Sequence, residues 1–109
     1  RGAAATIVNS TVRDLAQVRA LGYPLFGTDP SPVGVTGKKE PIAAQVPIKI
    51  GRVTIRPGDV IFGDVDGVVC IPKEHLQAVA DQADELGGHE AAARDRILAG
   101  EKLQSVWPA

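Results

Sequence analysis

The chain has few sulfur-containing and aromatic side chains. It contains one cysteine, Cys70, and no methionine among its 109 residues, and aromatic residues make up 4%. A single cysteine excludes a disulfide within the chain, which fits a reducing compartment and predicts a cytoplasmic protein. Because Cys70 lies in an apolar run, we expect a buried thiol. The scarcity of aromatics predicts a core of Val, Ile, Leu and Ala.

Long apolar runs and an excess of one charge are also missing. No run approaches the roughly 20 apolar residues that a membrane span needs, and no charged-then-apolar leader is expected, so we predict no membrane association. Twelve Lys and Arg residues against thirteen Asp and Glu give a net charge of −1. Lys38-Lys39 is the one adjacent lysine pair. This balance argues against direct nucleic-acid binding, but not against a protein partner.

The remaining composition is that of a globular protein. Hydrophobic residues make up 44%, and mean hydropathy is +0.02. The length predicts a single domain over residues 1–109, and a domain of this size gains from oligomerisation. The chain begins with Arg1 and not with Met. Processing, proteolysis and a chosen expression boundary are each compatible with that start.

The first part of the chain predicts a strand, a helix and a second strand. Residues 3–8 form an apolar run that favours a buried strand. Helical spacing of apolar residues then predicts a helix that begins at Asp14 and ends near Gly22. Residues 23–26 predict another short strand. Prolines and glycines over residues 28–41 indicate a segment that is mostly loop.

The middle of the chain is rich in alternating and β-branched residues. Arg56-Pro57-Gly58-Asp59 and Asp64-Val65-Asp66-Gly67 are typical turn sequences between strands. Pro47 favours an edge position for the first strand of this region. Four strands are predicted, over residues 46–50, 52–55, 60–62 and 68–71.

A helical tail is predicted over residues 73–106. Pro72 suits the entry to a helix, and apolar residues recur on one face from Leu76 to Leu86. Gly87-Gly88 is expected to interrupt or kink this helix, which resumes over residues 91–98. No internal repeat is present.

Two carboxylate motifs allow more than one interpretation. Arg13-Asp14 follows a strand and opens a helix, so Asp14 is either a helix cap beside a surface arginine or a ligand for Mg²⁺. In the second case Arg13 holds a substrate carboxylate. The carboxylates at 59, 64 and 66 form either a metal cluster or a turn in which Asp bonds its own backbone, and the turn is the commoner use.

Four segments, in this order, resemble the RraA-like family, which contains metal-dependent pyruvate aldolases and the regulator of RNase E activity. The first ends in the Arg-Asp pair, and together they cover nearly the whole chain. They are TIVNSTVRDL (6–15), RALGYPLF (19–26), VPI with RPGD and DVDGVV (46–48, 56–59 and 64–69), and the tail over residues 90–103.

The resemblance implies an α/β fold, the swivelling β/β/α domain, in a homotrimer or hexamer with sites between subunits. It implies a divalent-metal-dependent lyase that cleaves substrates of the 4-hydroxy-4-methyl-2-oxoglutarate and 4-carboxy-4-hydroxy-2-oxoadipate type to pyruvate and decarboxylates oxaloacetate with Mg²⁺ or Mn²⁺. By the same resemblance, Arg13 is the catalytic, substrate-binding residue and Asp14 the metal ligand. Glu90 corresponds to an acidic residue that a neighbouring subunit contributes.

The sequence also departs from the family pattern. Another carboxylate and a Gly-rich loop, both expected upstream of the Arg-Asp pair, have no counterpart here, so the N-terminal part of the domain is expected to be missing. Asn9-Ser10 replaces the usual Asp-Gly. Two alternatives to the lyase follow: a non-catalytic regulator that binds an RNase through its acidic helical tail, and a structural remnant without chemistry of its own.

Overall fold

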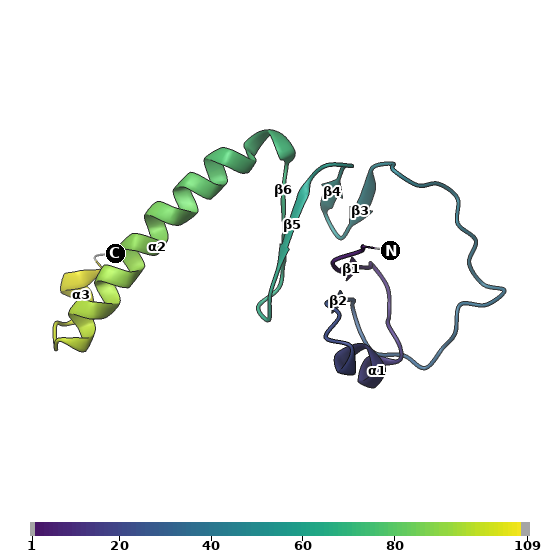
Figure 1. Cartoon of the computed structure of the whole chain (residues 1–109), viewed down its shortest axis with the longest axis horizontal. Helices are drawn as coiled ribbons and strands as arrows, with labels where there is room; N and C mark the ends of the chain where they lie inside the picture. Colours follow the sequence, from purple (N-terminus) through teal and green to yellow (C-terminus); the bar gives the residue numbers. More distant parts are fainter. Residues whose placement is uncertain (1, 108–109) are drawn as a thin grey trace. The chain divides into compact units, whose positions relative to one another are not determined.

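The computed structural model describes residues 2–107 and divides the chain into two compact units, residues 1–57 and 58–109 (Figure 1). Each unit is described by itself below. The division falls within the predicted turn at residues 56–59, where Gly58 takes a φ of 94°. No helix of the described residues is long and apolar enough to cross a membrane.

The first unit begins with a strand, a helix and a parallel strand. These are β1 (Thr6–Ile7), α1 (Leu15–Ala20) and β2 (Leu25–Phe26). Thr6 pairs with Leu25 in parallel register, so α1 serves as the crossover that parallel strands require (Figure 1). The Thr6 and Tyr23 hydroxyls lie 2.8 Å apart in a hydrogen bond. The predicted strand–helix–strand order is confirmed.

Pairing between these two segments continues beyond the strands themselves. The N–H of Val12 donates to the carbonyl of Asp29 at 2.9 Å, and the N–H of Ser31 donates to the carbonyl of Val12 at 2.8 Å. A parallel bridge joins Val12 to Pro30. The segment predicted as loop therefore begins with an isolated β-bridge, next to Arg13, and forms no further strand before residue 48 within the described residues.

The first unit also contains a hairpin. Strand β3 (Ile48–Ile50) pairs antiparallel with β4 (Val53–Ile55), and Ile50 faces Val53 across a turn. Gly51 supplies the positive φ, 58°, that this turn requires. Pro47 lies just before β3, where its missing N–H removes no hydrogen bond of the ladder.

The second unit opens with a longer hairpin. Strand β5 (Val60–Gly63) pairs antiparallel with β6 (Val68–Ile71). A carboxylate oxygen of Asp64 accepts the N–H groups of Asp66 at 2.8 Å and Gly67 at 3.3 Å. The turn interpretation of this motif is confirmed.

Helices make up the rest of this unit. A 3-10 turn, η1 (Lys73–His75), leads into α2 (Leu76–Leu98), which is followed by α3 (Leu103–Val106). Helix α2 passes through Gly87-Gly88 without a break, so the predicted interruption is wrong. The helical cost of a glycine is about 1 kcal/mol relative to alanine, which the many hydrogen bonds of a long helix outweigh.

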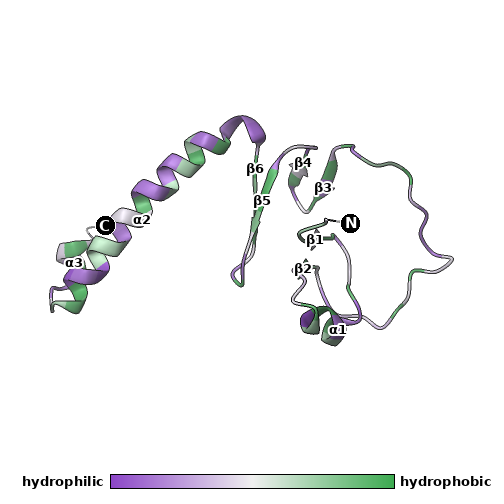
Figure 2. Cartoon of the chain, viewed as in Figure 1, coloured by the Kyte–Doolittle hydropathy of each residue, from purple (hydrophilic) through white to green (hydrophobic). Residues whose placement is uncertain are grey.

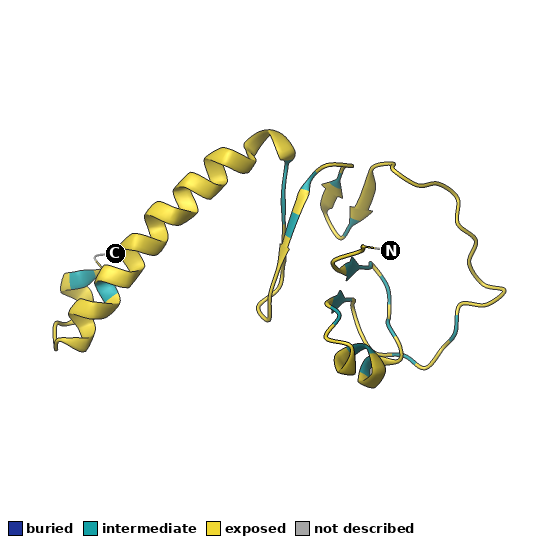
Figure 3. Cartoon of the chain, in the orientation of Figure 1, coloured by how far each residue is buried: buried dark blue, intermediate teal, exposed yellow. Residues whose placement is uncertain are grey.

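Apolar side chains of the described residues remain accessible. Figure 3 shows intermediate exposure at β1 and β2 and exposed positions along most of α2. No side chain within residues 2–107 is fully buried. The predictions of a buried strand at residues 3–8 and of a buried Cys70 are therefore wrong, and Cys70 has intermediate exposure. Polar and apolar residues alternate along α2 (Figure 2), yet Leu76 and Leu86 stay 39% and 49% exposed.

Candidate functional site

The Arg13-Asp14 pair lies where the pairing of the β1 segment ends and α1 begins. Asp14 occupies the N-cap position with φ 59° and ψ 32°, in the left-handed region. Its carbonyl accepts the first helical hydrogen bond, from the N–H of Val18, at 3.0 Å. Ligands of α/β proteins bind at the carboxyl ends of parallel strands, which is the position this pair takes.

The side chain of Asp14 does not cap the helix. It makes no capping hydrogen bond, and its Oδ2 accepts the Nε–H of Arg13 at 2.9 Å. The predicted start of the helix at Asp14 is confirmed, but capping by its side chain is wrong, because the carboxylate turns toward its neighbour. The two side chains are 54% and 56% exposed. An ion pair this accessible contributes little to folding, and both groups are open to a ligand.

The electrostatics of the pair favour the charged guanidinium. The hydrogen bond that Arg13 donates to Asp14, together with the negative charge of Asp14, raises the pKa of Arg13 further, against an opposing effect of desolvation. Arg13 therefore stays protonated at any working pH. It can act as an electrostatic anchor and a hydrogen-bond donor, but it cannot act as a general base.

Arg13 forms part of the wall of two pockets in the first unit. Val12 is the other residue that lines both. One pocket, of about 470 Å³, has Asp14 in its lining together with Leu15, Pro30, Ser31 and Pro32. The other, of about 320 Å³, extends along Gly34, Val35, Lys38 and Lys39.

Two glycines that the sequence did not single out make this arrangement possible. A Cβ on Gly27 would lie 2.5 Å from Cγ1 of Val12, the residue before Arg13. A Cβ on Gly34 would lie 3.0 Å from Nη1 of Arg13. Neither glycine has a positive φ, so their role is close approach: Gly27 requires it, whereas at Gly34 a Cβ would displace the flexible end of Arg13 by a few tenths of an ångström. Their isolated positions in a Gly- and Pro-rich stretch gave the sequence no signal of that role.

A divalent cation at the pocket of about 470 Å³ would meet one carboxylate of the chain, that of Asp14. Within residues 2–107, no group of three or more His, Cys, Asp or Glu side chains is placed to hold a metal ion. Mg²⁺ usually keeps several waters and binds one or two carboxylates together with oxygens of the substrate. An exposed carboxylate at the edge of a 470 Å³ pocket fits that mode, with Asp14 as the ligand.

Two carboxylates of the second unit, those of Asp59 and Asp64, accept hydrogen bonds at its turns. One oxygen of Asp59 accepts the N–H of Lys73 at 3.3 Å, at the start of η1, and the other lies 3.8 Å from Sγ of Cys70. Asp64 bonds its own turn, as described above. Asp59 was predicted as part of a turn or, alternatively, of a metal cluster, and its link to a residue fourteen positions later had no local signature.

Glu90 lies on α2 in the second unit. It is exposed and lines a pocket of about 390 Å³ with Ala93, Arg94, Ile97, Leu98 and Trp107. Because Arg13 and Asp14 belong to the other unit, the described geometry joins only those two of the three predicted site residues. The role of Glu90 between subunits stays a prediction.

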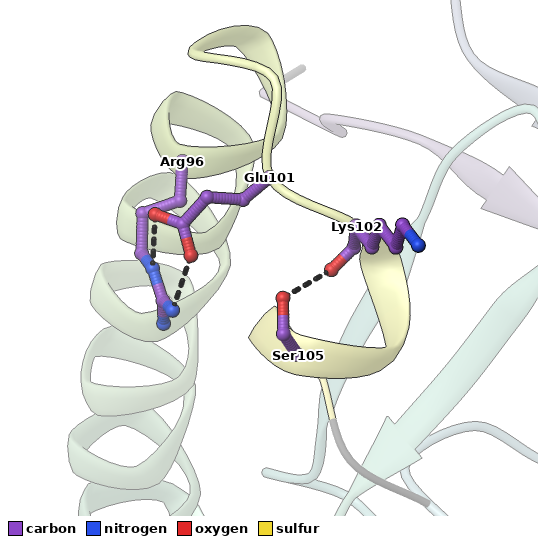
Figure 4. Close-up of polar contacts among 4 residues, drawn as sticks. All are labelled: Arg96, Glu101, Lys102 and Ser105. Atoms are coloured by element: carbon purple, nitrogen blue, oxygen red, sulfur yellow. Dashed lines mark hydrogen bonds and ion pairs between the residues drawn. The ribbon is translucent and has the colours of Figure 1, made fainter.

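The end of α2 beyond Glu90 is held by an ion pair. Arg96 donates from Nε to Glu101 Oε1 at 3.0 Å and from Nη2 to Oε2 at 2.6 Å (Figure 4). The Ser105 hydroxyl donates to the Lys102 carbonyl at 2.7 Å in the adjoining turn (Figure 4). These contacts fix the reversal between α2 and α3. Sequence inspection missed the pair because its partners are separated by a turn.

Known proteins share both the sequence and the fold. A family model described as RraA-like, Aldolase/RraA, matches residues 1–70. A protein of Halalkalibacterium halodurans, provisionally named a 4-hydroxy-4-methyl-2-oxoglutarate aldolase, is 38% identical over 105 residues, which cover 90% of this chain and 48% of that protein.

Solved structures give the same grouping. An uncharacterized protein of Pseudomonas syringae matches with a TM-score of 0.93 at 27% identity, over 97% of this chain and 53% of its own. Streptomyces coelicolor RraAS2, described as an unusual member of the RNase ES inhibitor RraA protein family, matches with a TM-score of 0.70 at 34% identity, over 79% and 44%. The chain therefore has an α/β fold of this kind.

The chain spans only part of its relatives. It covers 50% and 48% of the length of two curated relatives and 16% of a third.

Proposed function

Because the chain belongs to the RraA-like family, we propose that it carries part of the active site of a divalent-metal-dependent lyase. The substrates are 2-oxo acids of the 4-hydroxy-4-methyl-2-oxoglutarate type, which are cleaved to pyruvate, and oxaloacetate, which is decarboxylated. One observation carries this proposal: the contact between Arg13 Nε and Asp14 Oδ2, at the carboxyl end of a parallel strand and beside a pocket. The name of the H. halodurans relative supports it.

Both reactions pass through an enolate, so the site must stabilise negative charge on the oxo oxygen of the substrate. In aldol cleavage the 4-hydroxyl group loses its proton to water and becomes a carbonyl, while the electron pair of the broken C–C bond remains on the carbon next to the oxo group, which later takes up a proton. Negative charge develops on the oxo oxygen meanwhile. A bound Mg²⁺ or Mn²⁺ would supply Lewis acidity for this oxygen, and Asp14 would hold that cation, directly or through a water. Arg13 binds the carboxylate or oxo group by N–H donation and adds a fixed positive charge next to it.

The remaining parts of the site come from outside these residues. We propose that a carboxylate and a Gly-rich loop upstream of Arg13 complete the site in the whole protein. Glu90 of a neighbouring copy in a homotrimer or hexamer is proposed to reach the waters of the cation. The exposed apolar side chains of α2 support such an assembly, because surfaces of this kind usually bind other protein surfaces.

The test is pyruvate formation from oxaloacetate by the natural full-length protein, with Mg²⁺ and then with EDTA. We expect metal-dependent release of pyruvate that Arg13→Ala abolishes. Arg19→Ala is the matched control, because Arg19 is an exposed arginine on α1 that lines neither Arg13 pocket. Equal release in EDTA and in Arg13→Ala would exclude the proposed reaction.

A second candidate is a regulator that binds an RNase without catalysis. The description of the S. coelicolor neighbour as a member of an RNase inhibitor family favours it. Helix α2 offers an exposed surface with several carboxylates, which complements a basic partner. Co-purification with an RNase, and inhibition of RNA cleavage without any metal requirement, are the expected results. Unchanged cleavage at micromolar protein would exclude it.

A further inference from the structure

The second pocket beside Arg13 has an apolar wall of valine and leucine side chains, and its polar lining consists of cations and hydroxyl groups. Arg13, Lys38 and Lys39 line it together with Ser10 and Thr11. None of its lining residues is acidic. A concave surface in which positive charges meet hydroxyl donors is suited to bind an anion.

Two glycines fix the geometry of this pocket. The N–H of Lys38 donates to the carbonyl of Val35 at 2.9 Å, which closes a four-residue turn. Gly37, at the third position of that turn, has the φ of 71° that a type II turn requires. Gly34 leaves room for Arg13, because Nη1 of Arg13 lies next to the place that a Cβ on Gly34 would occupy. The backbone thus places Lys38 and the guanidinium of Arg13 in the wall of the same pocket.

Arg13 separates this pocket from the one that contains Asp14. Its Nε is bonded to Asp14, whereas its Nη1 lies beside Gly34, a residue that lines only the second pocket. A guanidinium carries several donors in a rigid plane and can serve two groups at once. A substrate that extends past Arg13 would therefore place its far end near the lysines.

We propose that Lys38 and Lys39 form a subsite for the carboxylate on the departing half of the substrate, which makes the site selective for aldol cleavage over decarboxylation. This inference rests on the proposed lyase function. In aldol cleavage the departing half keeps its carboxylate, and the lysines stabilise it throughout. In decarboxylation of oxaloacetate the far carboxylate leaves as neutral CO₂, so its binding to lysines stabilises the reactant and not the transition state.

The experiment compares two reactions in the natural full-length protein. In Lys38→Gln/Lys39→Gln, the ratio of kcat/KM for 4-hydroxy-4-methyl-2-oxoglutarate cleavage to kcat/KM for oxaloacetate decarboxylation should fall roughly tenfold, the usual size of losing a charged hydrogen bond. Lys38→Arg/Lys39→Arg should restore the ratio. Lys49→Gln, in β3 and outside the pocket, is the matched control and should leave it unchanged. A proportional fall in both reactions would indicate a structural effect and would overturn the subsite.

Metal-free calorimetry with glutarate separates this idea from the lyase proposal. The wild-type protein should bind glutarate, and the double glutamine variant should bind it roughly fivefold more weakly or worse. Absent or equal binding would overturn the subsite even if the lyase reaction is found. Normal glutarate binding without cleavage of either substrate would exclude the lyase function, and the pocket would then be an anion-binding site that is not part of a lyase.

Discussion

Replacing Gly27 by alanine tests whether close packing behind Arg13 determines the site. The added Cβ would lie 2.5 Å from Val12 Cγ1, about 1 Å inside the ~3.5–4.0 Å optimum for two carbon atoms. Rotation of Val12 relieves only part of this clash, because a rotamer that removes the methyl from the 2.5 Å position still leaves a methyl at the 3.3 Å position, which is itself a tight contact. The Ser10 carbonyl, 3.0 Å away, is fixed by its hydrogen bond from Thr28.

The expected loss is that of an overpacked site, about 1–3 kcal/mol in the free energy of unfolding. Urea unfolding of the full-length protein followed by circular dichroism measures it. Gly87→Ala is the control, because its Cβ meets nothing within 4 Å in α2 and should stabilise the helix by roughly 0.5–1 kcal/mol. In a Val12→Ala background, the cost of Gly27→Ala should shrink. An equal cost in both backgrounds would refute the proposed clash.

Three further predictions concern individual carboxylates. Asp64→Ala removes the side-chain acceptor of two turn N–H groups and should lower the free energy of unfolding by about 1 kcal/mol in a urea titration. Asp14→Asn should preserve stability, because Asn tolerates the left-handed conformation, while metal affinity measured by calorimetry falls; unchanged affinity would exclude Asp14 as ligand. The hydrogen bond from Arg96, with its charge, lowers the pKa of Glu101, so the pair stabilises the α2 end above pH 4.5, and this contribution disappears as the pH falls through the lowered pKa. Glu101→Gln should remove that part of the acid dependence of helicity; an unchanged profile would contradict it.

Local chemistry explains which parts of the fold were predictable. The hairpin over residues 60–71 was predicted with its turn, because Asp64 and Gly67 satisfy their backbone within four residues. The strand–helix–strand order around α1 followed from apolar spacing. By contrast, the extension of pairing to Val12 depends on prolines and glycines that read as loop in the sequence. The long helix outweighed the glycine pair at 87–88 because its hydrogen bonds act together.

The candidate site was only half predictable for a related reason. The positions of Arg13 and Asp14 came from a sequence motif, but their mutual contact replaced the expected helix cap. Gly27 and Gly34 escaped notice because a close approach between segments distant in sequence leaves no periodic signal. Burial of Cys70 was overpredicted because its apolar strand has no covering layer among the described residues.

The conformation of Asp14 is difficult to explain by stability alone. A non-glycine residue in the left-handed region is uncommon, and an uncapped helix start forgoes a favourable hydrogen bond. The contact with Arg13 offsets little of this, because both side chains are more than half exposed. Departures of this kind concentrate where a ligand uses the resulting geometry. The carboxylate of Asp14 contacts Arg13 while remaining open to solvent, and the metal and substrate site proposed above would use both features.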